Sequence, residues 1–515
     1  MSTENRPLEA EDENARDAAL NAEAQRVDDP ALRARIESII REALKTPDEG
    51  TPDERLAHGA SLRDEVPLAS HAVWDAPADR PDPVELLKEQ GVSRVQVLLP
   101  LRYERMSASA FTFYRGGALI MASDLSNTPS TGIQVQACGD AHISNFGLFN
   151  SPERHTVFDI NDFDETARGP WEWDVKRLAA SVEICGRDRM FTKEERKEAV
   201  LACAQGYCNG MAAFSRMGNL DVWYAHADVD LMMEHFAKQI PNKKRKTAQK
   251  VLGKAKGKNS ARAIVKLTEV VNGRLRVISN PPVLVPLRDL GHEGIQVDKL
   301  DAATTEKLVR LALSEYRQTL SPEKRLLVEQ YRGVDVAFKV VGVGSVGTRA
   351  LIVVMEGANR KDPLVLQIKE AQESVLERFC GKDPSVQHGQ RVVEGQRAMQ
   401  AASDMLLGWC QLPDQDGSMK DYYVRQLWDG KGSIDLTKID AKGLKMLSTV
   451  CGWTLAHAHA RTGDRFEIAG YLGDGVEFSK AIAKFARAYA KQNSEDYARF
   501  MEALESGELT TSFFS

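Results

Sequence analysis

The stretch VDVAFKVVGVGSVGTRALIVVMEG (residues 334–357) carries Gly342, Gly344, Ser345 and Gly347 between two runs rich in Val, Ile and Leu. Two kinds of phosphate-binding turn share the spacing G-x-G-x-x-G. In a dinucleotide-binding fold a helix follows the glycines directly, whereas TRALIVVMEG has the β-branched composition of a strand. We therefore expect a glycine turn between antiparallel strands, whose backbone N–H groups can approach phosphates. A plain hairpin turn is the alternative.

The next apolar run, PLVLQIKEA (residues 363–371), brings Lys369 close to the glycines. A Lys at the end of a buried strand can reach phosphate oxygens as a point charge, although such a Lys often only extends into solvent. Bound to phosphate, it needs a carboxylate from a neighbouring helix to hold it. Glu394 in RVVEGQRAM is the candidate, with Glu373 and Glu377 as alternatives.

An earlier region concentrates polar side chains. QACGDAHISNFG (residues 136–147) contains Asp140 and Asn145, five residues apart, and VFDINDFDETARGPWEWD (residues 157–174) adds four Asp and two Glu. Such carboxylates either hold a metal and take part in chemistry, or cap turns on a solvated surface. The five-residue separation of Asp140 and Asn145, together with the closely spaced aspartates of DINDFD, favours the first interpretation, a metal site.

GDAHISN resembles the H-G-D-x-x-x-x-N catalytic loop of aminoglycoside phosphotransferases and related small-molecule kinases, with Cys138 in place of the usual His. NDFDETARGPWEWD is similar to their metal-binding strand. The resemblance implies that Asp140 orients or deprotonates the acceptor hydroxyl and that Asn145 and Asp162 bind Mg²⁺. It also allows a second metal-binding carboxylate, Asp159 or Asp164. Asp174 would then cap the following helix and brace the catalytic loop.

In kinases the glycine turn and its Lys precede the catalytic loop, whereas here they follow it by about 200 residues. LSTVCGWTLAHAHARTGDRF (residues 447–466) resembles the helix that comes just before the loop in those kinases. These features predict an α+β, protein-kinase-like two-lobe fold in circularly permuted order. We expect four parts: a disordered or weakly helical leader (1–70), a mainly helical lobe with the catalytic and metal loops (71–333), a small β-rich nucleotide-binding lobe (334–430) and C-terminal helices that complete the helical lobe (431–515).

Residues of about 80 to 510 also resemble an uncharacterised bacterial family known as domain of unknown function 2252. The shared segments are RYERM, FTFYRG, GDAHISNFG, DINDFDE, GPWEWDVKRLA, VGVGSVGTR, QIKEA, GQRVVEGQR and HAHARTGD. This family brings no established activity, so the functional hypothesis rests on the candidate site.

The composition excludes several classes of protein. A net charge of -6 over 515 residues argues against a general nucleic-acid binder. No apolar run approaches the length of a membrane span, and the N-terminal sequence lacks the pattern of a secretory signal. Seven Cys without a C-x-x-C pair indicate neither a disulfide framework nor a zinc site. We expect a cytoplasmic protein that binds neither nucleic acid nor membrane.

The sequence therefore predicts an ATP- and Mg²⁺-dependent phosphotransferase with a nucleotide and an unknown acceptor, either a small molecule or a protein, as partners. Nucleotidyl transfer is equally compatible with these residues. Two other hypotheses remain open: a pseudokinase-type protein that binds a nucleotide or a partner, and a metal-dependent phosphoesterase that uses the Asp, His and Asn cluster.

Overall fold

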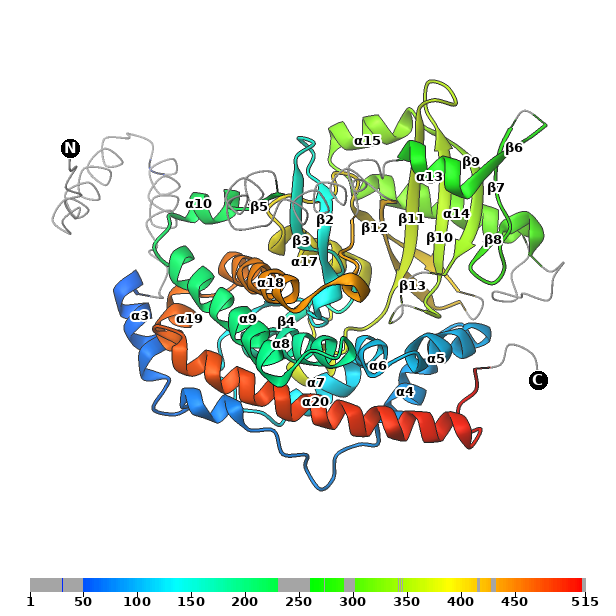
Figure 1. The fold of residues 1–515 in the computed structure, drawn as a ribbon. Helices are drawn as coiled ribbons and strands as arrows, with labels where there is room; N and C mark the ends of the chain where they lie inside the picture. Colours follow the sequence, from blue (N-terminus) through cyan, green and yellow to red (C-terminus); the bar gives the residue numbers. More distant parts are fainter. Residues whose placement is uncertain are drawn as a thin grey trace.

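A helical half and a half built on a six-stranded antiparallel sheet lie side by side in the computed structural model (Figure 1). Helices and several antiparallel sheets together confirm the α+β class. The structure describes residues 30, 50–229, 260–272, 274–290, 302–340, 342, 344, 346–414, 417–427 and 432–511.

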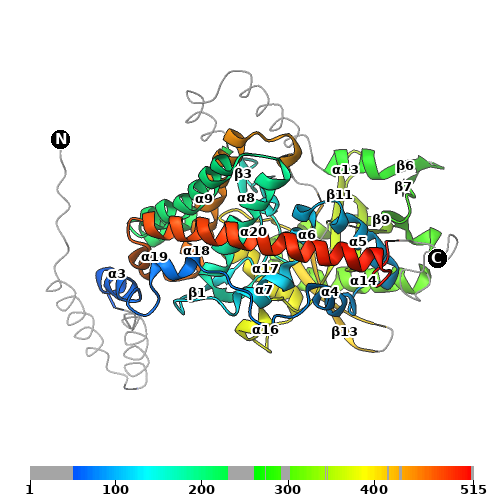
Figure 2. The same cartoon turned by 60° about the horizontal axis from the view of Figure 1, so that its bottom comes forward.

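The helical half joins segments from both ends of the chain, and α20 runs along its length (Figure 2). Its core helices are α8 (Trp171–Asp188), α9 (Lys193–Phe214), α18 (Ala441–Thr462) and α20 (Val476–Glu505). The remaining described helices of this half are α3 (Pro52–Ser61), α4 (Pro83–Gly91), α5 (Leu99–Ser107), α6 (Ala110–Gly116), α7 (Ala118–Leu125), α10 (Asn219–Tyr224) and α19 (Arg465–Leu472). Apolar residues at helical spacing explain α20, because Phe478, Ile482, Phe485 and Tyr489 form its buried face.

The large sheet has the order β12–β13–β11–β10–β9–β8. Its strands are β8 (Leu284–Pro286), β9 (Arg332–Lys339), β10 (Ala350–Glu356), β11 (Pro363–Ala371), β12 (Gly408–Pro413) and β13 (Met419–Gln426). The period of two sends alternate side chains to opposite faces. Leu351 and Val353 pack in the same cluster as α14 (Ala302–Gln318), whereas Ile352 packs in the cluster of α13 (Ser260–Leu267). Both faces are therefore buried.

The segment that contains Gly342, Gly344 and Gly347, called the glycine segment below, joins β9 to β10. These two strands pair antiparallel, with Leu351 opposite Phe338. Gly342 and Gly347 have φ values of 70° and 93°, which favour glycine. TRALIVVMEG forms β10 and no helix follows the glycines, so the predicted turn between strands is confirmed.

The boundaries of the parts differ from the prediction. The β-rich half begins well before residue 334, because α13, α14 and β8 contribute to the layers of the large sheet. The β6–β7 hairpin (Thr268–Val271, Arg274–Val277) and α15 (Pro322–Glu329) also precede residue 334. The expected leader is shorter than 70 residues, since α3 contacts α19 and Arg55 pairs with Asp464 at 2.6 Å. Residues 1–29 and 31–49 lie outside the described residues.

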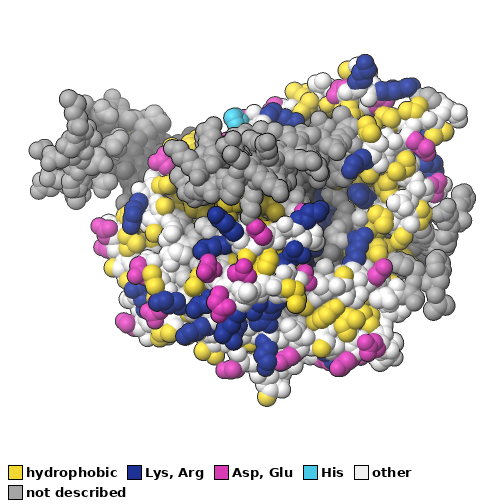
Figure 3. All heavy atoms as spheres, in the orientation of Figure 1, with side chains coloured by type: hydrophobic (Ala, Val, Ile, Leu, Met, Phe, Trp, Pro, Cys, Tyr) yellow, Lys and Arg dark blue, Asp and Glu magenta, His cyan; other side chains and the backbone are white. Residues whose placement is uncertain are grey.

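The surface carries charges of both signs. On the face in Figure 3, Lys and Arg side chains gather toward the lower part and are interspersed with Asp and Glu. Among the helices that the structure describes, none has the length and apolar character to cross a bilayer.

Candidate functional site

Two small strand pairs hold the loops that carry the predicted catalytic and metal residues. The loop of residues 138–145 runs from the first pair to the second, and the loop of residues 161–166 runs back. Pairing at both ends therefore places the loops side by side, and Asn161 N–H donates to the Asn145 carbonyl at 2.8 Å. The pairs are β1 (Gln134–Ala137) with β4 (Ala167–Pro170), and β2 (Phe146–Asn150) with β3 (Thr156–Ile160).

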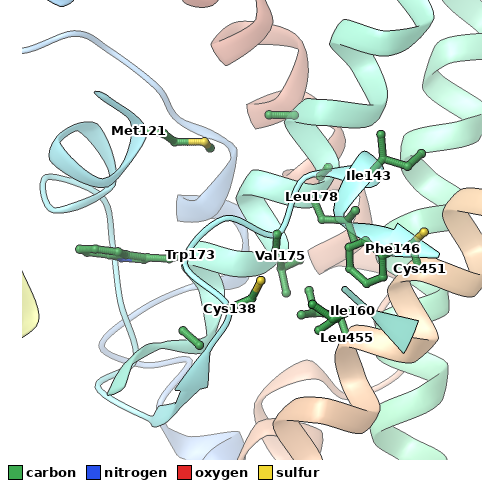
Figure 4. Close-up of a cluster of buried hydrophobic side chains, with 14 of the residues drawn as sticks. Met121, Cys138, Ile143, Phe146, Ile160, Trp173, Val175, Leu178, Cys451 and Leu455 are labelled. Atoms are coloured by element: carbon green, nitrogen blue, oxygen red, sulfur yellow. The ribbon is translucent and has the colours of Figure 1, made fainter. Parts of the chain in front are cut away.

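The loops approach each other so closely at Gly139 that only glycine fits. Its φ is +76°, and a Cβ there would lie 2.3 Å from the Glu165 carbonyl oxygen. Apolar side chains anchor the first loop in the helical core. Cys138, Ile143 and Phe146 are buried in one cluster with residues of α8 and α18, as Figure 4 shows. The loop is thus fixed by packing on both sides of its polar residues.

The central helix α8 braces the same loop through buried polar side chains. Asp174 accepts hydrogen bonds from the backbone N–H groups of Cys138 at 2.6 Å and Gly139 at 3.0 Å. Its carboxylate also lies 3.1 Å from His459 Nε2, which comes from α18. The bracing expected of Asp174 is present, but the capping is not, because the N-cap residue of α8 is Pro170.

Asp140 is held by Arg177, which also comes from α8. The guanidinium donates to Asp140 Oδ1 through Nε at 2.7 Å and through Nη2. Burial raises the pKa of Asp140 to about 6, while the charge of Arg177 and its hydrogen bonds act in the opposite direction. At neutral pH the group is therefore mostly ionised, and it can accept a proton close to physiological pH.

Asn145 and Asp162 line the same cleft as Asp140. Asn145 Nδ2 donates to the Asp140 carbonyl at 2.7 Å, and no described donor reaches its Oδ1. Amide and carboxylate oxygens are ligands that Mg²⁺ prefers, so these two residues fit a magnesium site. Across the described residues, no three His, Cys, Asp or Glu side chains are grouped to hold a metal by themselves.

The alternative metal ligand, Asp159, lies in the buried strand β3 and does not line the cleft. Its Oδ1 accepts a hydrogen bond from the Ile160 N–H at 2.8 Å. Burial raises the pKa of this carboxyl to about 7. The prediction that Asp159 is a metal ligand is therefore corrected: Asp159 lies within strand β3 and does not line the cleft, whereas Asp162 follows the strand in the loop and does.

Lys369 pairs with a carboxylate different from the predicted one. It lies on β11 opposite Ala350 and is fully buried. Its Nζ donates to Asp164 Oδ2, while Tyr423 donates to Asp164 Oδ1 at 2.8 Å. Although burial alone would raise the pKa of Asp164, the charge and hydrogen bond of Lys369 lower it to about 2.

Glu394, predicted to hold Lys369, is exposed and accepts a hydrogen bond from Gln390 one turn earlier in α17 (His388–Met399). The two alternatives are also engaged elsewhere: Glu373 pairs with Lys382 at 3.0 Å, and Glu377 lies 3.6 Å from Arg391. The carboxylate that pairs with Lys369 in the described residues is Asp164, which comes from the loop between β3 and β4 and not from a helix.

A cleft of about 340 Å³ brings several of the predicted residues together. Asp140, Asn145 and Asp162 line it from the helical half, and Gly342 and Gly344 line it from the glycine segment. Lys369 does not line the cleft itself but contacts it through Asp164, which does. Ser345 lies outside the described residues.

The first helical segment also reaches this cleft, which the sequence did not indicate. Arg105 donates to the Gly342 carbonyl and Arg94 to the Val346 carbonyl, each at 2.6 Å. Arg115 lines the wall beside them. Arg105 lies in the segment RYERM and Arg115 in FTFYRG, but nothing in the sequence indicated that either residue contacts the glycines.

A search of curated proteins found no significant match, and a search of solved structures found none either. The model of a family described as "uncharacterized protein conserved in bacteria (DUF2252)" matches residues 94–503. This range includes the loop of residues 138–145, the glycine segment and Lys369. The chain therefore belongs to this bacterial family.

Proposed function

We propose that the protein is an ATP- and Mg²⁺-dependent phosphotransferase with a kinase-like, circularly permuted arrangement. One observation carries the proposal: Asp140, Asn145 and Asp162 line a single cleft with Gly342 and Gly344, although about 200 residues separate the two groups. The order of elements around the glycines adds support. In protein kinases a glycine-rich loop joins the first two strands of the small lobe and covers the phosphates, and the Lys lies on the third strand. Here the glycines join β9 to β10, and Lys369 lies on the next strand.

The residues divide the work of a phosphoryl transfer. Asp140, ionised and held by Arg177, accepts the proton of an acceptor hydroxyl. Asn145 and Asp162 would hold Mg²⁺, which neutralises charge on the phosphate oxygens when bound. The glycine segment offers backbone N–H groups to the phosphates. Asp174 keeps the Asp140 loop in place through two backbone hydrogen bonds.

The pairing of Lys369 with Asp164 has a consequence for this proposal. A buried Lys with a carboxylate partner can contact a phosphate only if it shares or exchanges that partner. Because Asp164 already holds Lys369, a protein that binds a nucleotide without transferring its phosphate, a pseudokinase, is the second hypothesis. A two-metal phosphoesterase has less support, because the described part of the chain has no group of three or more His, Cys, Asp or Glu side chains placed to hold a metal ion.

The test compares binding and turnover in two variants. Mg·ATP should raise the melting temperature of the wild-type protein, and a ligand at 100 times its Kd adds about 2.7 kcal/mol to the free energy of unfolding. Asp162→Ala should weaken the Mg²⁺-dependent part of this shift and abolish turnover. Asp140→Ala should keep the shift and abolish turnover.

Each outcome separates the hypotheses. Binding without turnover in the wild type, whatever the acceptor offered, supports the pseudokinase. A wild-type melting temperature that does not respond to Mg·ATP contradicts both nucleotide hypotheses. Loss of binding in Asp140→Ala but not in Asp162→Ala would reverse the two assignments.

A further inference from the structure

Three arginines near the cleft lack a carboxylate partner. Arg94, Arg102 and Arg115 form no ion pair with any described residue. Buried nitrogen atoms of their guanidinium groups also lack a hydrogen-bond acceptor: Nε of all three residues and Nη1 of Arg102. Guanidinium groups out of water are costly when they remain unpaired. The three guanidinium groups of this arginine cluster therefore lack the anionic partner that would stabilise them.

The cluster lies next to the glycine segment. Arg94 donates to the Val346 carbonyl at 2.6 Å, and Val95 N–H donates to the Gly347 carbonyl at 2.8 Å. A Cβ on Gly344 would lie 3.2 Å from the Arg115 carbonyl oxygen. Arg102 is fully buried behind this wall and donates to the Gly116 carbonyl at 3.1 Å.

Arg94 and Arg115 both line the cleft, and Arg115 is the member of the cluster whose charge interacts with those of Asp140 and Asp162. Neither carboxylate lies within ion-pair distance of it, and Asp140 is already paired with Arg177. No hydrogen bond of the Arg115 side chain to another described residue is present. Its Nε is buried, whereas its two Nη atoms are not, so the Nη donors remain for a ligand.

Resting on the proposed function, we propose that Arg115, supported by Arg94 and Arg102, is a binding site for the terminal phosphate oxygens of an oligophosphate. Arg presents a planar fork of N–H donors that matches a phosphate. The position between the glycine segment and Asp140 places that fork where a transferred phosphoryl group lies. Because the arginines are part of the chain, this binding needs no divalent cation.

The experiment uses inorganic tripolyphosphate as the probe, in EDTA, with the full-length protein. Calorimetric titration should detect binding to the wild type that weakens with added salt. Arg115→Ala should weaken it at least tenfold, and Arg115→Lys should fall between the two, because Lys keeps the charge but not the fork. Arg378→Ala is the matched control and should bind like the wild type, since Arg378 also lines the cleft but pairs with Glu89 at 2.7 Å.

No binding by the wild type, or equal binding by wild type and Arg115→Ala, would overturn the inference. Should Arg115→Ala fail to fold, Arg115→Lys decides by the same criterion. The proposed function can fail separately. If tripolyphosphate binding depends on Arg115 but Mg·ATP binding does not depend on Asp162, the anion site stands and the phosphotransferase proposal is contradicted. If Mg·ATP turnover is unchanged in Arg115→Ala, the phosphotransferase proposal stands and the anion site is contradicted.

Discussion

At the scale of single residues, the pKa of Asp140 links its surroundings to a rate. Burial raises this pKa to about 6 against the opposing charge of Arg177. A general base must be deprotonated, so kcat/KM should rise with pH through about 6 and level off above it. Arg177→Gln removes the cation and should shift the rise to higher pH.

The pH profile of kcat/KM for both proteins measures this effect. Arg177 also donates to the Tyr114 carbonyl, so a melting temperature is needed to show that the variant is folded. A rise at the same pH in the wild type and in Arg177→Gln would mean that the profile does not report Asp140.

Asp159 should affect stability and not metal binding. Its pKa is raised from 3.8 to about 7, so between these pH values the folded protein keeps a proton that the unfolded chain has lost. The free energy of unfolding therefore falls as pH rises through this window and is level above it. Asp159→Asn should reduce that slope, although Asp140 and Glu165, whose pKa values are also raised, will maintain part of it.

Urea unfolding at pH 5 and pH 8 measures this slope in the wild type and the variant. Mg²⁺-dependent ATP binding should be intact in Asp159→Asn and weakened in Asp162→Asn. If Asp159→Asn also lost the Mg²⁺ dependence, the metal site would include β3 after all. The sequence could not separate the two aspartates, because a strand that is buried throughout has no polar alternation to show which way each side chain points.

At the scale of elements, the glycine segment depends on backbone conformation. Gly347 has a φ of +93°, and a Cβ there would lie 3.0 Å from Arg94 Cβ. Gly347→Ala should therefore lower the free energy of unfolding by about 1–2 kcal/mol. Gly333→Ala in β9 is the matched control and should not be destabilising, since no heavy atom lies within 4 Å of the added Cβ. Chemical denaturation of both variants measures the difference, and equal stabilities would contradict the argument.

Elements with a clear local pattern were predictable from the sequence. The β-branched composition of Leu351 to Met355, after the glycines, indicated a strand after a turn, and the helical spacing of Phe478 to Tyr489 indicated a helix. Short strands such as β8 were not predictable, because three residues are too few to establish a period of two. The place of β8 in the large sheet depends on β9, with which it pairs.

At the scale of the whole molecule, the contact between the two halves was beyond sequence reasoning. Lys369 and Asp164 are 205 residues apart, and a helix was the expected source of the carboxylate. The partner is instead set by how the sheet docks on the loop between β3 and β4. The same docking brings Arg94 and Arg115 to the glycines. Long-range pairs of this kind carry no local pattern, so the candidate site was only partly visible in the sequence.

A double-mutant cycle tests whether this contact couples the halves. Lys369→Met and Asp164→Asn each leave a buried group without its charged partner, so each should lower the free energy of unfolding. The double variant leaves neither charge unpaired. It should therefore be more stable than the sum of the single effects predicts, with a coupling energy of more than about 1 kcal/mol. The exposed pair Lys438 and Asp435 is the control, and its cycle should show no coupling beyond experimental error because solvent screens both charges. Additive effects at Lys369 and Asp164 would mean that this ion pair does not couple the two halves.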